Sequence, residues 1–564
     1  MQFANQRPIM KRFIFFIALI SMFTACKNNK NDKETTNGNN TGNTENTENS
    51  KKITKRDYSI NGSNSYSDLF LDSNTVENFI AEKKLNDTIA RRLRSFYNAR
   101  NYQYAWFSGD GITEQGRSFW NVHEYYSTYS KDAALDDKTL EKKMNAMITV
   151  DTLKIKAADK SVANTEIKLT QHFIQYLINN YKSGEIKRKE IERFVPFKKA
   201  DALYLADSLL TKKHKDDKYY SDVNPAYKLL KVQLQKYYDI TRNGGWQSVT
   251  TNAKRIKKGD SSLIVSALKK RLQVTGEMPS TDDTAQTFDD QLVNAVKTFQ
   301  TTHGLTPNGV VTQALIKEMN VSALKRVEQL LINMDRTRWI LNREEGNLIM
   351  VNIPEFVLHV YEGKNKIFDM NVVVGKEGHN TTIFTGNLNQ VVFSPYWNVP
   401  DDIVEKEILP AVEKDPDYLA KNEMEETGET HDAIPVVRQL PGPKNSLGKV
   451  KFLFPNSFDI YFHDTPAKSL FSQDKRAYSH GCIRLSDPIK MANYLLRSQP
   501  EWTAQKIDEA MNSSEEQFVK LKNPVPVLIT YYTAWVDEKG LLNFRDDIYG
   551  HDNNLVQKMF TNPL

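Results

Sequence analysis

The apolar residues change their spacing once along this chain of 564 residues, and that change restricts what the chain can fold into. Up to about residue 337 they recur at helical intervals, so that Leu169, Phe173, Tyr176 and Leu177 share one face of a helix. Beyond it they gather in short β-branched or aromatic runs bounded by turns, which predict strands. These runs are 348–353, 357–361, 370–374, 391–393, 460–462 and 526–532. We therefore expect a multidomain α+β protein.

The helical part of the chain divides into three segments. Residues 57–250 are expected to form one α-helical domain, and residues 251–320 a small unit of short helices. Residues 321–344 are expected to form a connecting helix. The apolar positions that mark these helices are Tyr227, Leu230 and Leu234; Val265, Leu268, Leu272, Leu292, Ala295, Val296 and Phe299; and Val327, Leu330, Leu331 and Met334. Asn224-Pro225 and Gly244-Gly245 are expected to begin and end the helix that carries Tyr227.

Residues 345–550 are expected to form a β-rich domain with an insertion. Between about 400 and 435 the strand pattern gives way to acidic sequence of mixed helical character. A long insertion near a site often acts as a lid, and a solvated acidic pair of helices is the alternative. Residues 551–564 are expected to be a C-terminal tail.

The N-terminal residues 1–26 read as an export signal. Lys11 and Arg12 precede an apolar run at 13–23, which is too short to span a bilayer, and Thr24-Ala25 precede Cys26. Phe23-Thr-Ala-Cys26 resembles a bacterial lipobox, which implies that Cys26 is lipidated. The alternative is an ordinary secretory signal that is cut nearby. Residues 27–56 contain few apolar residues, and we expect a disordered tether there.

The charge of the chain does not indicate nucleic-acid binding. Its 76 basic and 70 acidic residues give a net charge of +6 that is spread along the sequence. The partners must therefore be inferred from individual sites.

A cysteine and two histidines form the strongest chemical pattern, in the run Ser479-His480-Gly481-Cys482-Ile483-Arg484 and at His463. A thiol with an ordinary pKa near 8.5 is mostly protonated at neutral pH, so a nucleophilic cysteine needs a neighbouring imidazole. The same three side chains could instead hold zinc, although no typical zinc spacing supports that reading. A buried structural cysteine, or a disulfide between Cys26 and Cys482, is the structural alternative.

The distant histidine and the Ser-His-Gly-Cys-x-Arg run resemble the signature of YkuD-type L,D-transpeptidases, which cross-link peptidoglycan. The segments 438–452 and 454–456 resemble the large multidomain members more narrowly. Residues 295–312 resemble a three-helix peptidoglycan-binding domain. The resemblance implies a scaffold domain at 57–250, a peptidoglycan-binding domain at 251–320, and a YkuD-type catalytic domain at 345–550 whose insertion is a capping subdomain.

The resemblance also implies a mechanism and a set of roles. Cys482 attacks the carbonyl that precedes the terminal D-Ala of a tetrapeptide stem, and an amine of a neighbouring stem resolves the thioester into a 3→3 cross-link. His463 is the general base, held by the main-chain carbonyl of Asp464, and the N–H groups of Gly481 and Cys482 stabilise the oxyanion. His480 positions the catalytic loop. The residues expected to contact substrate are Arg484, Ser479, Tyr461, Trp397 and Asn445. A structural salt bridge is the alternative for Arg484.

The expected partners are peptidoglycan tetrapeptide stems, glycan strands and, through lipidated Cys26, a membrane. No metal or organic cofactor and no nucleic acid is implied. The expected location is the periplasm, with the lipid anchor in the bacterial envelope, at the outer membrane. Hydrolysis or D-amino acid exchange at the same site, and an inactive tether that only binds the wall, remain as alternatives.

Overall fold

The structure is a computed structural model that describes residues 52–130, 132–149, 153–180, 194–211, 225–280, 285–339 and 346–561. The predicted export signal, Cys26 and nearly all of the predicted tether lie outside these residues. The described residues from 53 onward form one compact unit. No helix within the described ranges is both long enough and apolar enough to cross a membrane.

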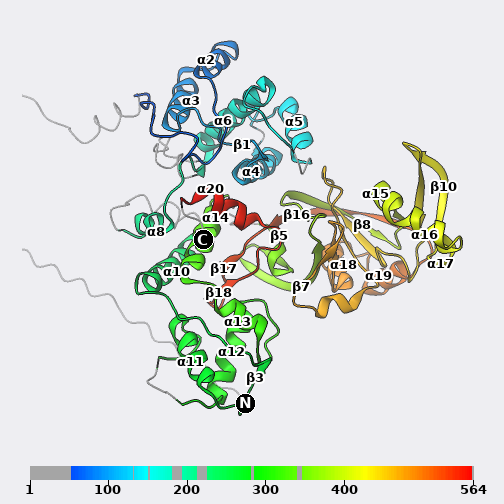
Figure 1. The fold of residues 1–564 in the computed structure, drawn as a ribbon. Helices are drawn as coiled ribbons and strands as arrows, with labels where there is room; N and C mark the ends of the chain where they lie inside the picture. The colour runs from blue at the N-terminus through cyan, green and yellow to red at the C-terminus, as the bar shows by residue number, and fades with distance from the viewer. Residues whose placement is uncertain are drawn as a thin grey trace, which may run out of the picture. The chain divides into compact units, whose positions relative to one another are not determined.

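The first domain is helical, as the apolar spacing predicts, and polar side chains cap several of its helices. Asp72, Asn86 and Asp201 each accept a hydrogen bond from a main-chain N–H in the first turn that would otherwise lack a partner. A short hairpin lies between α3 and α4 (Figure 1). The elements are α2 (Ser73–Glu82), α3 (Asp87–Ala99), β1 (Phe107–Ser108), β2 (Gly111–Ile112), α4 (Glu114–Ser130), α5 (Lys138–Ile148), α6 (Lys160–Asn180), α8 (Ala202–Leu210) and α10 (Pro225–Arg242).

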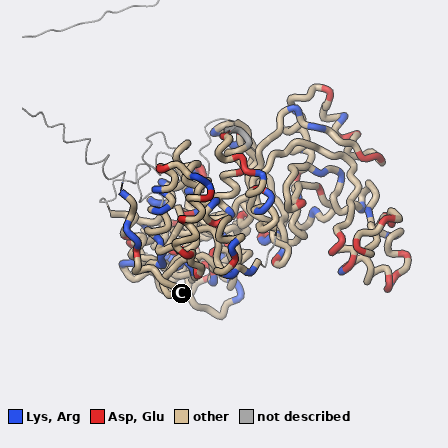
Figure 2. The backbone as a smooth tube through the Cα atoms, turned by 90° about the horizontal axis from the view of Figure 1, so that it is seen from above, with Lys and Arg blue, Asp and Glu red and all other residues tan. Residues whose placement is uncertain are grey.

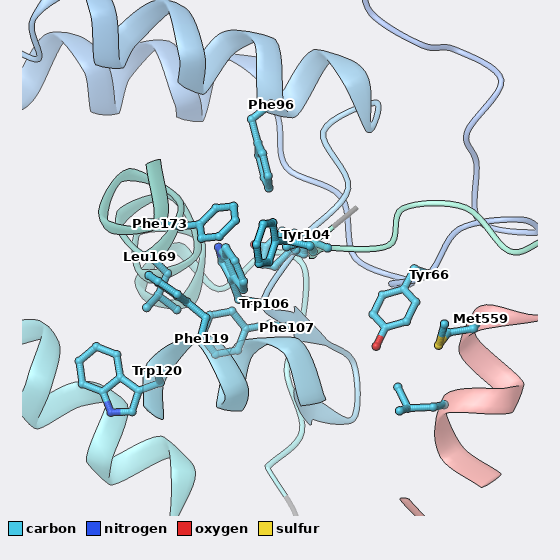
Figure 3. Close-up of a cluster of buried hydrophobic side chains, with 14 of the residues drawn as sticks. Tyr66, Phe96, Tyr104, Trp106, Phe107, Phe119, Trp120, Leu169, Phe173 and Met559 are labelled. Atoms are coloured by element: carbon cyan, nitrogen blue, oxygen red, sulfur yellow. The ribbon is translucent and has the colours of Figure 1, made fainter. Parts of the chain in front are cut away.

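Aromatic rings fill the core of this helical domain (Figure 3). The Trp106 ring lies 5.1 Å from the Phe119 ring and 5.2 Å from the Phe173 ring. The predicted face of α6 is buried here, with Leu169, Phe173 and Leu177 fully inaccessible to solvent. Large apolar surfaces packed in this way supply most of the stability of the domain.

The C-terminal residues complete the same core, so the prediction of a C-terminal tail is wrong. α20 (His551–Met559) buries Leu555 and Met559 in the core of the helical domain. Arg336, on α14 (Ala323–Thr337), forms ion pairs with Glu114 of α4 at 2.6 Å and with Asp552 of α20 at 2.5 Å. α20 is short and mostly polar, so its few apolar residues do not show a helical spacing from which the helix could be predicted.

The segment after α10 forms the predicted small helical unit and the connecting helix α14. Its core contains Val265, Leu268 and Leu272 of the first helix and Phe299 of the second. Gly276 ends the first helix with a φ of 85°. The elements are β3 (Arg255–Ile256), α11 (Leu263–Thr275), α12 (Asp290–Thr302), β4 (Val311–Thr312) and α13 (Gln313–Met319).

The second half of the chain contains a nine-stranded sheet that closes on itself. The strand order is β14-β7-β15-β13-β12-β8-β16-β5-β6, and β6 also pairs with β7. Apolar side chains from all around this ring form a separate core, with helices α18 (Pro488–Leu496) and α19 (Ala504–Met511) packed against it. The strands are β5 (Asn347–Asn352), β6 (Val357–Glu362), β7 (Asn365–Gly375), β8 (Thr385–Phe393), β12 (Val450–Leu453), β13 (Phe462–His463), β14 (Ala477–Ser479), β15 (Ile483–Leu485) and β16 (Gln517–Thr530).

The insertion has its own small sheet and apolar cluster, and the expectation of helical structure holds only for its first half. Figure 1 shows α15, α16, α17 and β10 grouped together, and in Figure 2 Asp and Glu gather at the right of the view, where this segment lies. Val399, Val404, Ile408 and Val437 form the cluster. The elements are β9 (Trp397–Asn398), α15 (Asp401–Ile403), η2 (Val404–Ile408), α16 (Leu409–Lys414), α17 (Tyr418–Lys421), β10 (Met424–His431) and β11 (Ile434–Gln439).

Candidate active site

Two parallel strands place the predicted site residues on one face of the sheet. β13 pairs with β15 so that Phe462 lies opposite Ile483, and His463 lies opposite Arg484. Phe462 and Ile483 are fully buried in the core of the closed sheet. Because side chains alternate along a strand, His463 and Arg484 point to the other face, as do Tyr461 and Cys482 just before the two strands. The strand that carries His463 and the strand that follows Cys482 are therefore neighbours in the sheet.

The imidazole of His463 is buried and fixed in one tautomer. Its Nδ1–H donates to the main-chain oxygen of Asp464 at 2.5 Å, which leaves Nε2 as the acceptor nitrogen. This is the orientation that the family resemblance implied. Burial, together with the positive charge of Arg484, lowers the pKa of His463 to about 3. The ring is therefore neutral at physiological pH and able to accept a proton.

The carbonyl that holds His463 is itself tightly constrained. The Asp464 carboxylate accepts hydrogen bonds from the Lys449 N–H at 2.9 Å and from the Lys468 ammonium at 2.5 Å. Gly448 has a φ of 61°, and a Cβ built on it would lie 2.4 Å from the Asp464 carboxyl group. Only glycine fits at this position, because any side chain would displace Asp464.

The thiol of Cys482 is protonated in the resting site. It lies 3.6 Å from the main-chain oxygen of Asp459, to which it donates. Burial raises the pKa of Cys482 to about 11, and the hydrogen bonds from Tyr461 oppose that rise. With a neutral imidazole nearby, the site rests as an uncharged pair.

The loop before Cys482 is held by side-chain hydroxyl groups. Ser479 Oγ donates to the Cys482 carbonyl at 2.6 Å and accepts the Gly481 N–H at 3.2 Å. Thr381 Oγ1 donates to the Gly481 carbonyl at 2.7 Å, and Gly481 has a φ of 114°. The Gly481 N–H is thus already engaged, whereas no acceptor for the Cys482 N–H lies among the described residues. Ser479 is buried and shapes the loop, so its expected contact with substrate is replaced by a positioning role.

Arg484 places its guanidinium group on the same face of the sheet. It is half-buried, and its Nε has no hydrogen-bond partner within the described chain. Burial lowers the pKa of Arg484, and the nearby Cys482 opposes that change. A buried donor without a partner is costly, which favours a role in binding an anionic or carbonyl group of a ligand.

The remaining predicted residues lie in different surroundings. Tyr461 borders the thiol, with its ring 5.8 Å from the His463 ring, and burial raises the pKa of its hydroxyl. His480 is exposed and contacts the insertion through Glu407. Trp397 packs on the apolar cluster of the insertion.

Asn445 does not line the cleft, which corrects the sequence expectation. Its side chain is fully buried, and its amide nitrogen donates to the carbonyls of Pro395 at 2.9 Å and of Leu440 at 3.0 Å. Its oxygen accepts the Leu447 N–H at 2.8 Å. Asn445 therefore ties the two connections of the insertion together and supports the turn that contains Gly448.

The zinc alternative lacks the geometry that it requires. Over the described ranges, no group of three or more His, Cys, Asp or Glu side chains is placed to hold a metal ion. His463, His480 and Cys482 therefore do not converge as a ligand set.

A cavity of about 820 Å³ lies between the helical domain and the sheet domain. Glu124 and His123 of α4 line it, together with Asn387 of β8 and Phe458 of the loop after β12. Neither Cys482 nor His463 is among its lining residues. The cavity is therefore separate from the thiol site.

A thiol and a fixed, neutral imidazole on one face of a closed sheet are the groups that nucleophilic acyl transfer uses. The comparisons with known proteins agree with this class of site. Residues 346–529 match the L,D-transpeptidase catalytic domain, YkuD; residues 91–234 match the scaffold domain; and residues 261–319 match the "Putative peptidoglycan binding domain". The chain thus contains one segment that matches each of these three domains.

One curated relative is the "Putative L,D-transpeptidase" of Haemophilus influenzae. It is 30% identical over 254 residues, which cover 42% of this chain and 50% of the relative. The chain thus aligns with about half the length of that relative.

Two solved structures of L,D-transpeptidases are also similar. The one from Xylanimonas cellulosilytica is 13% identical, and the match covers 50% of this chain and 99% of that chain with a TM-score of 0.16. The one from Stackebrandtia nassauensis is 15% identical, with 50% and 97% covered and a TM-score of 0.20.

Sequence reasoning missed several residues that shape the site. Lys376, Thr381 and Asp459 lie outside the motif 479–484. In the folded state they contact His480, Gly481 and Cys482, respectively. A polar residue in a turn is a common feature, so no local signal distinguished them.

Proposed function

We propose that this protein is an L,D-transpeptidase that forms 3→3 peptidoglycan cross-links through an acyl-enzyme on Cys482, with release of D-Ala. The parallel pairing of β13 with β15, which gathers Tyr461, His463, Cys482 and Arg484 on one face, is the observation that carries the proposal. The catalytic-domain match at 346–529 supports it.

In the first half of the reaction, Cys482 Sγ attacks the carbonyl carbon that precedes the terminal D-Ala. His463 Nε2 accepts the thiol proton, and the Cys482 N–H donates to the developing oxyanion. As the tetrahedral intermediate collapses, the C–N bond breaks and His463 returns the proton to the leaving amine. The products are a thioester on Cys482 and free D-Ala.

In the second half, the amine of a neighbouring stem attacks the thioester. His463 takes a proton from that amine, the C–S bond breaks, and the proton passes to the sulfur. The thiol and the neutral imidazole are restored, and a new amide bond joins the two stems.

The uncharged resting pair fits this sequence of steps. With a thiol pKa near 11 and an imidazole pKa near 3, a thiolate–imidazolium pair is unfavourable before substrate binds. Proton transfer is therefore coupled to the attack on the carbonyl. A protonated thiol is also less prone to oxidation, which suits a cysteine exposed to an oxidising compartment.

Two other functions remain as alternatives to cross-linking. Water or a free D-amino acid could replace the stem amine and would give carboxypeptidase or exchange activity. A chain without activity could serve as a tether to the wall, but the intact arrangement of His463, Cys482 and Arg484 favours the enzyme.

We further propose that the protein is exported, acts in the periplasm, and is anchored by lipid on Cys26 at the outer membrane. The peptidoglycan-related domains support a location in the cell envelope. Residues 57–250 act as the scaffold domain, residues 251–320 bind glycan strands, and residues 321–344 connect them to the catalytic domain at 345–550.

The decisive experiment is mass spectrometry of muropeptides after the purified protein is incubated with sacculi rich in tetrapeptides. We expect new 3→3 dimers and free D-Ala from the wild type and neither product from Cys482→Ala. Release of D-Ala without dimers would favour the carboxypeptidase alternative. Absence of both products from a folded wild-type protein that still binds sacculi would favour the tether.

A further inference from the structure

A loop from β7 runs beside the catalytic loop and brings two basic side chains to His480. The Lys376 N–H donates to the Ser479 carbonyl at 2.8 Å, and Thr381 Oγ1 donates to the Gly481 carbonyl at 2.7 Å. Between these two anchors, Lys376 Nζ lies 3.3 Å from His480 Nε2. The His379 ring lies 4.7 Å from the His480 ring. One lysine and two imidazoles thus converge two residues before the nucleophile.

A carboxylate from elsewhere in the chain already contacts this cluster. Glu407 belongs to η2 of the insertion, and its Oε1 lies 3.0 Å from His480 Nε2. The Glu407 side chain is 53% exposed, so solvent screens the contact and it stabilises the fold little. Asp402 and Lys406 of the insertion are the other charged groups near His379. A weak, exposed contact of this kind exchanges readily with a ligand.

The proposed substrate carries a carboxylate at a suitable position. His480 is two residues from Cys482 along the chain, in a bend in which Gly481 has a φ of 114°. The carboxyl group of the leaving D-Ala is three bonds from the carbonyl carbon that the thiol attacks. Burial, His480 and Lys376 lower the pKa of His379, as expected where positive charge lacks a full complement of anions.

We propose that Lys376, His379 and His480 form a subsite for the terminal carboxylate of the leaving residue, and that Glu407 occupies this subsite until the donor stem binds. The inference rests on the proposed transpeptidase function. It accounts for the removal of a terminal residue: an internal peptide bond has no carboxylate at this distance from the carbonyl. Glu407 of the insertion then competes with the substrate carboxylate for the subsite, and the donor stem displaces Glu407 when it binds.

The test compares two donors, a tetrapeptide stem with a free terminal carboxylate and the same stem with a terminal amide. The kcat and KM for release of D-Ala or D-alaninamide are measured for the wild type, Lys376→Met and Glu407→Gln. Lys364→Met and Glu405→Gln are the matched controls, because Lys364 is an exposed lysine of the β6–β7 turn and Glu405 is an exposed neighbour of Glu407 on η2.

The wild type should prefer the acid over the amide by at least about tenfold in kcat/KM, since a charge-assisted contact is lost with the amide. Lys376→Met should bring this ratio close to one. Glu407→Gln should lower the KM for the acid severalfold while the KM for the amide stays the same. The two controls should keep the wild-type ratio.

An equal rate on acid and amide by the wild type would overturn the subsite while leaving the transpeptidase function intact. So would a Lys376→Met variant that loses both activities in proportion, because that outcome indicates a structural role. A third donor with an amidated side-chain carboxylate on the diamino acid separates the two possible sources of the anion: dependence on that group alone would also overturn the assignment. A wild type that releases no product from any donor would instead refute the proposed function.

Discussion

The Nδ1–H of His463 donates to the carbonyl of Asp464, while the carboxylate of the same Asp464 fills the space beside Gly448. One residue therefore fixes the imidazole through its main chain and is itself held through its side chain.

The first prediction concerns the nucleophile and its base. Cys482→Ala should abolish cross-linking and acyl-enzyme formation, and His463→Ala should keep the fold and lose about 10²- to 10⁴-fold in rate. A carbapenem, whose strained lactam carbonyl can acylate a thiolate, should leave an adduct on Cys482 alone in peptide mass spectrometry. His431→Ala, an exposed histidine of the insertion, is the control and should retain full activity. Turnover by Cys482→Ala would end the cysteine mechanism.

Gly448 should be essential for activity, whereas a comparable glycine should not. Gly448 and Gly363 have φ values of 61° and 57°, but only Gly448 has a neighbour within 4 Å of the missing Cβ. Gly363→Ala should therefore cost about 1–2 kcal/mol of stability through backbone strain alone and leave the rate unchanged. Gly448→Ala should cost more and should lower kcat, because Asp464 must move. Equal effects of the two variants on kcat would contradict this account.

The thiol of the free protein should become reactive only at alkaline pH. Because burial raises the pKa of Cys482 to about 11, its alkylation by iodoacetamide should keep accelerating between pH 8 and 10.5. Intact-protein mass spectrometry of the Cys26→Ser variant, in which Cys482 is the one thiol left, measures this rate. A plateau reached by pH 7 would instead reveal a thiolate–imidazolium pair.

Acid should destabilise the helical domain through a pair of buried histidines. His123 Nε2 and His172 Nδ1 lie 2.9 Å apart, and burial lowers the pKa of His172 to about 4 and that of His123 to about 3. A histidine with a depressed pKa in the folded state stabilises the fold above its unfolded pKa of about 6.5. That stability is lost as the pH falls, by up to about 1.4 kcal/mol per pH unit for each ring.

The variant His172→Gln isolates this effect from other titrations. Glu124 and Glu166, whose pKa values burial raises to about 7, oppose the loss between about pH 7 and 4.5 in both proteins. Urea unfolding at pH 7.5, 5.5 and 4.5 should show a shallower decline of the unfolding free energy for the variant. Parallel curves for the two proteins would contradict the assignment.

The ion pairs that hold α20 should matter far more than a pair at the surface. The Arg336 side chain is 6% exposed and faces two carboxylates, so Arg336→Met should cost about 3–5 kcal/mol because both are left buried without their partner. Arg497→Met removes a pair with Glu362 in which both side chains are 40% exposed, and should cost about 1 kcal/mol or less. Similar losses in thermal unfolding would show that the site around Arg336 is well solvated.

Much of the fold and the chemical motif could be predicted because their signals are local. The helical face of Leu169, Phe173 and Leu177 is buried as predicted, and the strand runs at 348–353 and 357–361 coincide with β5 and β6. Residues 460–462 were expected to form a strand, but only Phe462 lies in one. Short strands such as β13 and β15 depend on pairing across the sheet, which a single run of residues does not encode.

The errors have physical causes that are specific to each segment. β10 exposes nearly its whole length to solvent, so it lacks the apolar alternation by which a strand is recognised. Asn445 has the polar character of a ligand-binding residue, yet its side chain is used by the main chain of Pro395 before the insertion and of Leu447 after it. Lys376 reaches His480 only because β7 pairs with both β14 and β15.

The insertion leaves and rejoins the sheet domain at residues that face each other. Trp397 and Gln439 are register partners in the small sheet formed by β9 and β11. The intervening chain can therefore be shortened, replaced or exchanged for that of another protein by joining two neighbouring points, without altering the strand order of the ring. Substrate preference in such a protein could then diverge by changes in one exchangeable module, while the thiol and its imidazole remain on strands that the module never enters.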